Sequence, residues 1–384
     1  MTDWRVSLGR PCFAEPEERA IISALHDAQI SSGPKCTLLE ERIGAYLHKP
    51  HAVCTNSGTS ALWAILKAMK IRGEVICPSF TFAATANAII QAGAKPVFAD
   101  IEPRTCGLST YSVNAAITEN TEAIMLVHFA GMPAIGAPRL YYVARKRRLF
   151  LIEDCAEALG TWNRKGRRAG THGQATALSF FPTKNITCGE GGMALFQNQE
   201  VADYARRLVA HGIQRDKDKP WKRDTMLAGM NMRLSDILAS VALEQFKRLS
   251  ELNEQRRQTA LQYDNAFRGT PIDPLWNADK DLGCSYQMYT AYWLGTRGAI
   301  SFLNRKQRDK LVLGIREQGV EASVHFDPPI HQHAYYQSMF NRKWELPNTE
   351  AVSASIFTLP MYPQMTAEDI ETVLTAVRKA VENV

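Results

Sequence analysis

An acid and a lysine near the middle of the chain have the types and positions needed to hold an aldehyde cofactor. Asp154 ends the segment 150–154, and Lys184 closely follows the apolar segment 175–181; both segments are short enough for buried strands. Ligands of parallel α/β sheets collect at the carboxyl ends of such strands. A partly desolvated lysine there can form a Schiff base, and an acid can keep a pyridine nitrogen protonated, so the pair indicates pyridoxal phosphate. The alternative is that Asp154 caps a helix and Lys184 is a solvated loop residue.

A third element, more than a hundred residues upstream of Lys184, could bind the phosphate of such a cofactor. The small polar residues 55–60 precede apolar residues at helical spacing, namely Leu62, Ile65, Leu66 and Met69. The N–H groups and the dipole at a helix N-terminus attract phosphate, and Gly58 allows the backbone to approach the anion closely. An ordinary Ser or Thr helix cap would explain the same residues. Together with the acid and the lysine, however, the segment completes the set of contacts that the cofactor needs.

These residues must be positioned by a larger fold, and the pattern of apolar segments predicts an α/β class. Strand-like runs at 74–77, 95–100 and 123–128 alternate with polar or helical segments. Such alternation is typical of βαβ units and a mostly parallel sheet. A charged helical run, 250–267, follows, and the remainder mixes strands and helices. We therefore expect a large α/β domain with an N-terminal arm over residues 1–249 and a smaller C-terminal α+β domain over residues 250–384.

The composition is that of an ordinary globular protein. The 384 residues are 45% hydrophobic and 22% charged. No apolar run approaches the length of a membrane span, the N-terminus lacks the core of a signal peptide, and the eight cysteines have no metal-ligand spacing. We expect a cytoplasmic protein with reduced thiols and no metal or membrane partner. The net charge of +6 is mild, and the basic run 144–148 is interpreted as a solvated helix face, not a nucleic-acid site.

Short motifs along nearly the whole chain resemble one enzyme family. They read NSGTSAL at 56–62, PSFTF at 78–82, EDCA at 153–156, SFFPTKN at 179–185, GEGG at 189–192, GMNMRLSD at 229–236, VHF at 324–326, PIH at 329–331, LPNTE at 346–350 and LPMYP at 359–363. These motifs are similar to those of the DegT/DnrJ/StrS sugar aminotransferases, which are pyridoxal-phosphate enzymes of fold type I. The resemblance runs from about Gly33 to the C-terminus.

The resemblance implies a role for each motif residue. Lys184 would bind the cofactor as a Schiff base and then act as the general base that moves a proton between the substrate and the cofactor. Asp154 would pair with the pyridinium nitrogen. Gly58 and Thr59 would hold the phosphate through backbone donors, and Ser179 would add a hydroxyl.

Two further residues are implied to contact the cofactor. Phe82 corresponds to an aromatic residue that stacks on the pyridine ring, the alternative being an ordinary core phenylalanine. Asn231 corresponds to a residue that reaches the phosphate of the neighbouring subunit, the alternative being a turn residue next to Gly229. The expected assembly is therefore a homodimer whose active sites are shared between subunits.

One position departs from the commoner pattern of the family. Many relatives carry His or Gln near the phenolate oxygen of the cofactor, where this chain has Glu157. A carboxylate there would repel the phenolate unless one of the two groups held a proton. A Glu at the start of a helix, favoured by the helix dipole, is the interpretation that we adopt from the sequence.

The substrate is implied less directly. The family acts mostly on nucleotide-linked keto sugars, with glutamate as the usual amino donor. Candidate substrate contacts lie in three places: Gly33, Lys219 with Trp221, and His325 with His331. The basic loop 214–224 around Trp221 could bind a diphosphate and stack on a base, although a solvated loop explains the same charges.

Other functions within this fold remain open from the sequence. One is a non-catalytic regulator that binds pyridoxal phosphate, another is an aminotransferase for cyclitols or other keto substrates, and a third is a dehydratase. The dehydratase branch replaces the Schiff-base lysine with histidine, so Lys184 argues against it. The complete set of cofactor contacts argues against a regulator.

Overall fold

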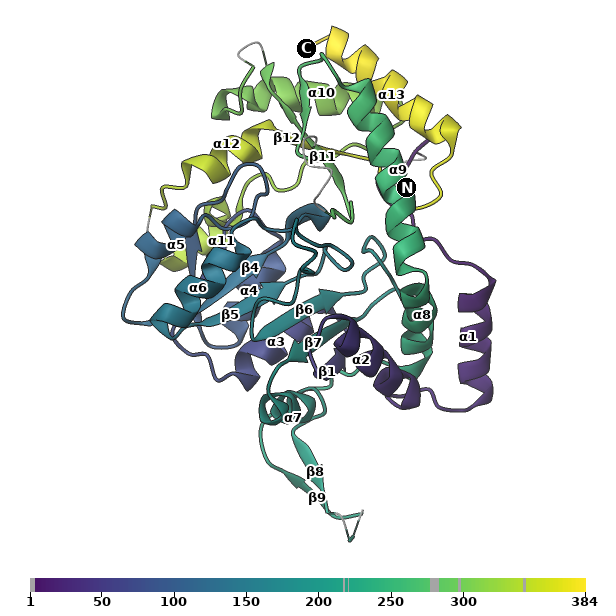
Figure 1. Ribbon diagram of the computed structural model, residues 1–384, viewed down its shortest axis with the longest axis vertical. Coiled ribbons are helices and arrows are strands. Elements are labelled where there is room, and N and C mark those ends of the chain that lie inside the picture. Colours follow the sequence, from purple (N-terminus) through teal and green to yellow (C-terminus); the bar gives the residue numbers. More distant parts are fainter. Residues whose placement is uncertain (1–3, 217, 220, 277–282, 296–297, 341–342) are drawn as a thin grey trace.

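A seven-stranded sheet forms the centre of the larger part of the molecule (Figure 1). The computed structural model describes residues 4–216, 218–219, 221–276, 283–295, 298–340 and 343–384. The strand order is β1-β7-β6-β5-β4-β2-β3, and β7 alone runs in the direction opposite to the other six strands. The strands are β1 (His51–Thr55), β2 (Glu74–Pro78), β3 (Lys95–Ala99), β4 (Thr121–Val127), β5 (Phe150–Asp154), β6 (Ala175–Ser179) and β7 (Gly192–Phe196). The predicted α/β class with a mostly parallel sheet is confirmed.

Helices cover both faces of this sheet because its strands present apolar side chains on both sides. Along β1, Val53 packs in the core that contains α3, whereas Ala52 and Cys54 pack in the core that contains α2 and α8. Such alternation follows from the two-residue period of a strand. The helices of this part are α1 (Glu15–His26), α2 (Pro34–Tyr46), α3 (Gly58–Ala68), α4 (Ala83–Gln91), α5 (Thr110–Ala116), α6 (Ala137–Arg147), α7 (Gln199–Leu208) and α8 (Asp236–Lys247).

A second layer of structure begins with the long helix α9 (Leu249–Ala266) and lies above the first in Figure 1. Its sheet has the order β10-β11-β12 and is antiparallel. The N-terminal residue Val6 shares this core and bridges Val320, so the N-terminal arm packs on the second layer. The elements are β10 (Ile272–Pro274), β11 (Tyr289–Trp293), α10 (Arg305–Glu317), α11 (Ala334–Phe340), α12 (Pro347–Ser355), β12 (Ile356–Leu359) and α13 (Ala367–Glu382).

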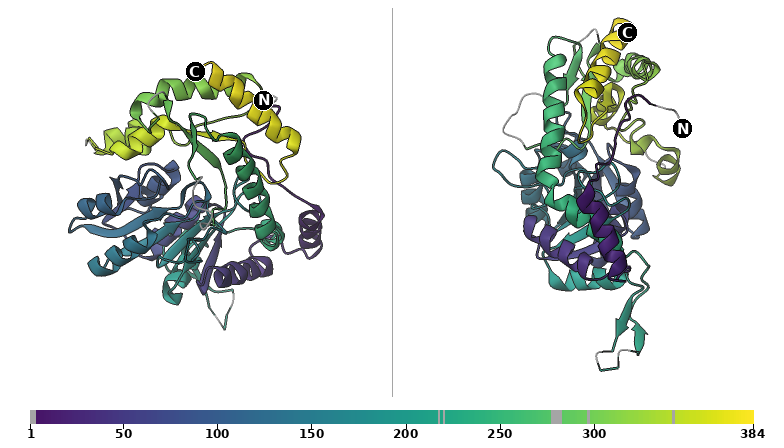
Figure 2. Two further views of the ribbon diagram at one scale, coloured as in Figure 1. Left: turned by 45° about the horizontal axis from the view of Figure 1, so that its top comes forward. Right: turned by 90° about the vertical axis from the view of Figure 1, so that its right-hand side faces the viewer.

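A two-stranded hairpin projects away from both layers. It consists of β8 (Ile213–Arg215) and β9 (Arg223–Thr225), and it extends from the body of the molecule in Figure 1 and in the right-hand view of Figure 2. Its strands are largely exposed to solvent. In the part of the chain that the structure describes, no helix has the length and apolar character that a membrane crossing requires.

Candidate active site

The predicted acid and lysine lie together at the carboxyl ends of β5 and β6. Asp154 is the last residue of β5, and Lys184 follows β6 after a short turn. The Lys184 Nζ lies 3.2 Å from Glu157 Oε1. Both side chains are partly shielded, with 16% of Lys184 and 12% of Glu157 exposed. The interpretation of Glu157 as a helix-start residue was wrong, because residue 157 lies in a turn and its carboxylate contacts the lysine.

Asp154 is fixed by two donors and is almost fully buried. Thr85 Oγ1 donates to its Oδ2 at 2.9 Å, and the Ala156 N–H donates to its Oδ1 at 3.1 Å. Burial raises the pKa of Asp154, although these two hydrogen bonds and the charge of Lys184 oppose the shift. A positively charged ring nitrogen beside Asp154 would stabilise the ionised carboxylate, which burial alone disfavours. The site therefore suits a pyridinium.

The N-terminus of α3 presents a cradle suited to a phosphate. Ser57 caps the helix by accepting the Ser60 N–H, and a Cβ added to Gly58 would lie 2.8 Å from the Ser179 Cβ. The helix therefore approaches β6 as closely as a glycine allows, with Ser179 beside it. Thr59 occupies the second position of α3 and is exposed, so its N–H is among those left without a partner inside the helix.

This close approach makes Gly58 a test of the cradle. We expect Gly58→Ala to weaken pyridoxal phosphate binding roughly 10-fold to 100-fold, because overpacking at this contact costs about 1–3 kcal/mol. Fluorescence titration of the cofactor-free protein measures the affinity. Adding Ser179→Gly should restore space and part of the affinity. Unchanged binding by the single variant would contradict a phosphate site here.

An exposed aromatic ring lies near the segment that carries His325 and Phe326. The Phe82 side chain is 64% exposed, and its ring centroid lies 6.4 Å from that of Phe326. Phe326 in turn packs edge-on against the buried Phe80 and Phe129. An exposed ring supported in this way can stack on a flat ligand. The alternative of an ordinary core phenylalanine is wrong for Phe82.

His325 is the candidate substrate residue that lies closest to this chemistry. Its Nδ1 lies 2.9 Å from Thr358 Oγ1. Burial lowers the pKa of His325, while the nearby charges of Glu157 and Lys184 act in opposite directions. A neutral imidazole beside Lys184 can accept or donate a hydrogen bond to a polar substrate.

The other candidate substrate residues lie in separate surroundings. His331 is buried, with its Nδ1 2.6 Å from Ser79 Oγ and its Nε2 3.3 Å from Glu350 Oε1. Gly33 caps α2, and its N–H donates to the buried Asp236 at 2.9 Å. Lys219 and Trp221 are both exposed and lie at the end of the projecting hairpin. Their parts in binding a substrate stay predictions.

Asn231 lies where the hairpin returns to the sheet. Its backbone bridges Ala210, and its side chain is exposed. The next residue, Met232, accepts the Asn56 N–H at 2.8 Å within the same chain. The segment that carries Asn231 therefore adjoins the turn before α3, and whether its side chain serves its own or a neighbouring subunit stays a prediction.

The loop of Lys184 is held from behind by residues that the sequence did not single out. Arg256 of α9 donates to the carbonyls of Lys184 at 3.2 Å and Asn185 at 3.4 Å, and Gln287 donates to that of Thr183 at 2.9 Å. Burial lowers the pKa of Arg256 to about 10. Nothing local in the sequence predicts these contacts, because the partners lie about 70 or more residues away from the loop.

The neighbour of Asp154, Glu153, serves the structure and not the site. It accepts N–H groups of Gly170, His172 and Gly173, and His128 Nε2 lies 2.9 Å from its Oε2. Burial alone would raise the pKa of Glu153, but the hydrogen bond and charge of His128 help to bring it to about 2. These contacts tie the loop around residue 171 to the loop after β4.

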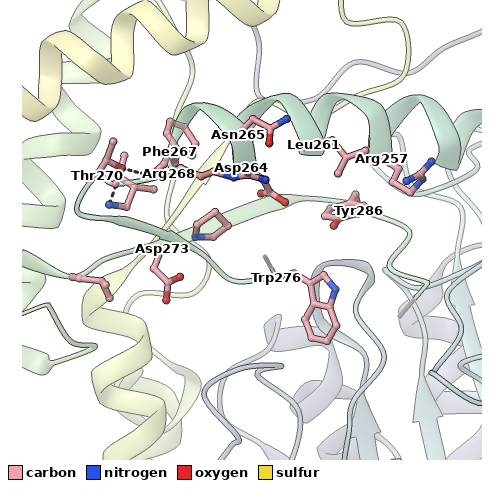
Figure 3. A pocket seen from close by; sticks show the side chains of 14 residues that line it. Arg257, Leu261, Asp264, Asn265, Phe267, Arg268, Thr270, Asp273, Trp276 and Tyr286 are labelled. Atoms are coloured by element: carbon pink, nitrogen blue, oxygen red, sulfur yellow. Dashed lines mark hydrogen bonds between the residues drawn. The ribbon is translucent and has the colours of Figure 1, made fainter. Parts of the chain in front are cut away.

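A separate cavity of about 770 Å³ lies beside α9 (Figure 3). Figure 3 shows Arg257, Leu261 and Asp264 of α9 on one side and Trp276 and Tyr286 on the other. None of the predicted cofactor or substrate residues is among the described residues that line it.

Comparisons with known proteins find one family across nearly the whole chain. The model of the DegT/DnrJ/EryC1/StrS aminotransferase family matches residues 11–378. The spore coat polysaccharide biosynthesis protein SpsC of Bacillus subtilis is 33% identical over 384 residues, covering 97% of this chain and 96% of SpsC.

Three solved structures share the fold across nearly all of the chain. Helicobacter pylori PseC, an aminotransferase involved in the biosynthesis of pseudoaminic acid, has a TM-score of 0.91 and 26% identity, covering 99% of this chain and 100% of that one. The PMP-form of Spr1654 from Streptococcus pneumoniae gives 0.90 and 26%, covering 98% and 99%, and its PLP-form is also similar. DesI, solved in the presence of its TDP-sugar product, gives 0.86 and 28%, covering 99% and 93%. Because the family model spans nearly the entire sequence, this chain belongs to the DegT/DnrJ/EryC1/StrS aminotransferase family.

Proposed function

We propose that the chain is a pyridoxal-phosphate-dependent aminotransferase that moves an amino group from glutamate to the keto group of a nucleotide-linked sugar. The observation that carries the proposal is the approach of Lys184, beside Glu157 and near Asp154, to the open ends of β5 and β6, next to the glycine cradle of α3. The sugar substrate is supported by the role of PseC as an aminotransferase of pseudoaminic acid biosynthesis and by the TDP-sugar product of DesI.

Each site residue of this chain would have a separate role in the reaction. When bound, pyridoxal phosphate supplies the electron sink that stabilises negative charge on the substrate carbon. Lys184 would hold the cofactor and then move a proton at its Nζ. Asp154 would keep the nitrogen of the cofactor ring protonated. The side chain of Phe82 would stack on the same ring and hold its orientation. Gly58, Thr59 and Ser179 would hold the phosphate.

The activity can be tested directly with a panel of keto sugars. The purified protein is incubated with glutamate and with keto sugars linked to TDP, UDP, GDP or CMP, and the release of 2-oxoglutarate and of an amino sugar is followed by mass spectrometry. We expect turnover with at least one nucleotide class. Transamination of a cyclitol ketone alone, or loss of a substrate hydroxyl without gain of nitrogen, would contradict the proposed substrate.

The subunit arrangement yields a further prediction. If Asn231 binds the phosphate of a neighbouring subunit, mixing Lys184→Ala and Asn231→Ala subunits should restore activity. One site of the hybrid dimer then combines native Lys184 with native Asn231, and the other collects both changes. Activity of the mixture is compared with that of each variant alone.

A matched control decides how this experiment is interpreted. Hybrid dimers must first be shown to form, for example with two different affinity tags. If they form, each parent is impaired and the activity of the mixture stays at the level of the parents, then Asn231 acts in the site of its own subunit or lies outside any site.

A further inference from the structure

Glu157 is held in place by the protein before any cofactor contact is considered. Its Oε2 accepts the Ala130 N–H at 2.9 Å, which leaves Oε1 directed at the Lys184 Nζ at 3.2 Å. Ala130 lies in a tight turn at positive φ. Thr161 Oγ1 donates to the carbonyl of the next residue, Gly131, at 2.6 Å. The carboxylate is therefore positioned by the backbone and does not simply follow the lysine.

The turn that orients Glu157 is itself fixed by the buried network of Glu153. The Ala134 N–H donates to His128 Nδ1 at 3.1 Å, and His128 Nε2 lies 2.9 Å from Glu153 Oε2. This histidine precedes Ala130 by two residues. Residues on both sides of Ala130 are thus held by hydrogen bonds, and these contacts position the Ala130 N–H that donates to Glu157.

The groups that face Glu157 leave Lys184 as its cationic partner. Besides Lys184, the charges of Asp154 and His325 interact with Glu157. Asp154 is a second acid, and burial lowers the pKa of His325, which keeps that ring neutral near pH 7. Among the described residues, Lys184 is the one cation in hydrogen-bond contact with Glu157.

We propose that Glu157 is the proton partner of Lys184, a role that rests on the proposed function of this site. Its carboxylate, 3.2 Å away, stabilises a positive charge on the Lys184 Nζ and is placed to accept a proton from it. Before Lys184 can act as a nucleophile or base, an N–H bond of its ammonium group breaks and an O–H bond forms on Glu157 Oε1. The electron pair stays on the lysine nitrogen, and the return of the proton restores the pair.

The size of the expected effect follows from the distance. Two unit charges 3.2 Å apart in water-like screening shift a proton equilibrium roughly tenfold. Glu157→Gln removes the negative charge but keeps the shape and an acceptor for the Ala130 N–H. The variant is therefore expected to fold.

The test measures the reactivity of Lys184 in the full chain stripped of cofactor. The protein is labelled with a trace of acetic anhydride at a series of pH values, and the labelled fraction of each lysine is measured by mass spectrometry after digestion. We expect the labelling curve of Lys184 in Glu157→Gln to move about one pH unit lower, so that labelling is roughly tenfold faster on its rising part. Glu157→Asp, which keeps the charge on a shorter side chain, should recover part of the shift.

Matched controls separate this effect from a general change in structure. Glu244→Gln removes the carboxylate of another close Glu–Lys pair, 2.6 Å from Lys247 on α8, and should leave the Lys184 curve unchanged. The curve of Lys95 should be the same in every variant. The experiment needs no substrate, so its failure is distinguishable from failure of the proposed sugar activity.

One outcome overturns the proposal regardless of activity. If wild type and Glu157→Gln give the same Lys184 labelling curve, Glu157 does not share a proton with Lys184, even if turnover falls. A second readout is the visible absorbance of the cofactor-loaded protein as a function of pH. Its transition should also move to lower pH in Glu157→Gln, and an unmoved transition counts equally against the proposal.

Discussion

Lys184→Ala should abolish transamination while the protein still binds pyridoxal phosphate without a covalent bond. The variant loses the amine that attaches the cofactor and moves the proton, but it keeps Asp154, the α3 cradle and Phe82. Borohydride reduction followed by peptide mapping should find a pyridoxyl group on residue 184 of the wild type and none on the variant. Equilibrium dialysis measures the cofactor that stays bound to the variant.

The assignment of Lys184 as the attachment point has a matched control variant, and two results would contradict it. Lys247→Ala changes an exposed lysine of α8 and should retain both the covalent label on Lys184 and the activity. A pyridoxyl group found on another lysine of the wild type would show that Lys184 is not the attachment point. Residual turnover of Lys184→Ala near the wild-type rate would show the same.

Asp154→Asn should leave a coloured enzyme whose turnover is lower by orders of magnitude. The amide keeps the size of the side chain and can accept one of the two hydrogen bonds, from Thr85 or from Ala156, but it cannot carry the charge that keeps a ring nitrogen protonated. Single-turnover kinetics with glutamate measure the loss in the chemical step separately from substrate binding. A near-native rate would show that another acid faces the ring.

Thr85→Val provides a graded comparison for Asp154. It removes the hydroxyl that donates to Asp154 Oδ2 at 2.9 Å while keeping the size of the side chain. Turnover should fall less than in Asp154→Asn, because the carboxylate keeps its charge and its hydrogen bond from Ala156. A larger loss than that of Asp154→Asn would mean that Thr85 has a separate role.

The parts of the fold that the sequence predicts are those written in local patterns. The apolar runs of β2, β4 and β5 are flanked by polar residues, so their strand character is visible within a few positions. The helix that starts at Gly58 is likewise predicted by small polar residues before a periodic apolar segment. Residues at the ends of such elements could therefore be named as site candidates.

The contacts that orient the site are not local and could not be predicted in this way. Glu157 was interpreted as a helix-start residue because only its neighbours in sequence were considered. Its two partners, Ala130 and Lys184, each lie 27 residues away in opposite directions along the chain. A turn after β5 brings them together, and no periodicity in the sequence encodes that turn.

Arg256 and Gln287 have a consequence for how this protein can be divided or recombined. Both belong to the part of the chain after residue 249, yet they hold the backbone carbonyls of Lys184 and Thr183. A fragment that ends at residue 249 would keep every predicted cofactor contact and lose the supports of its lysine loop. If the C-terminal part of a relative were grafted onto this chain, the grafted part would need an arginine and a glutamine at the matching positions. These two residues are therefore the contacts that the design of a hybrid enzyme must preserve.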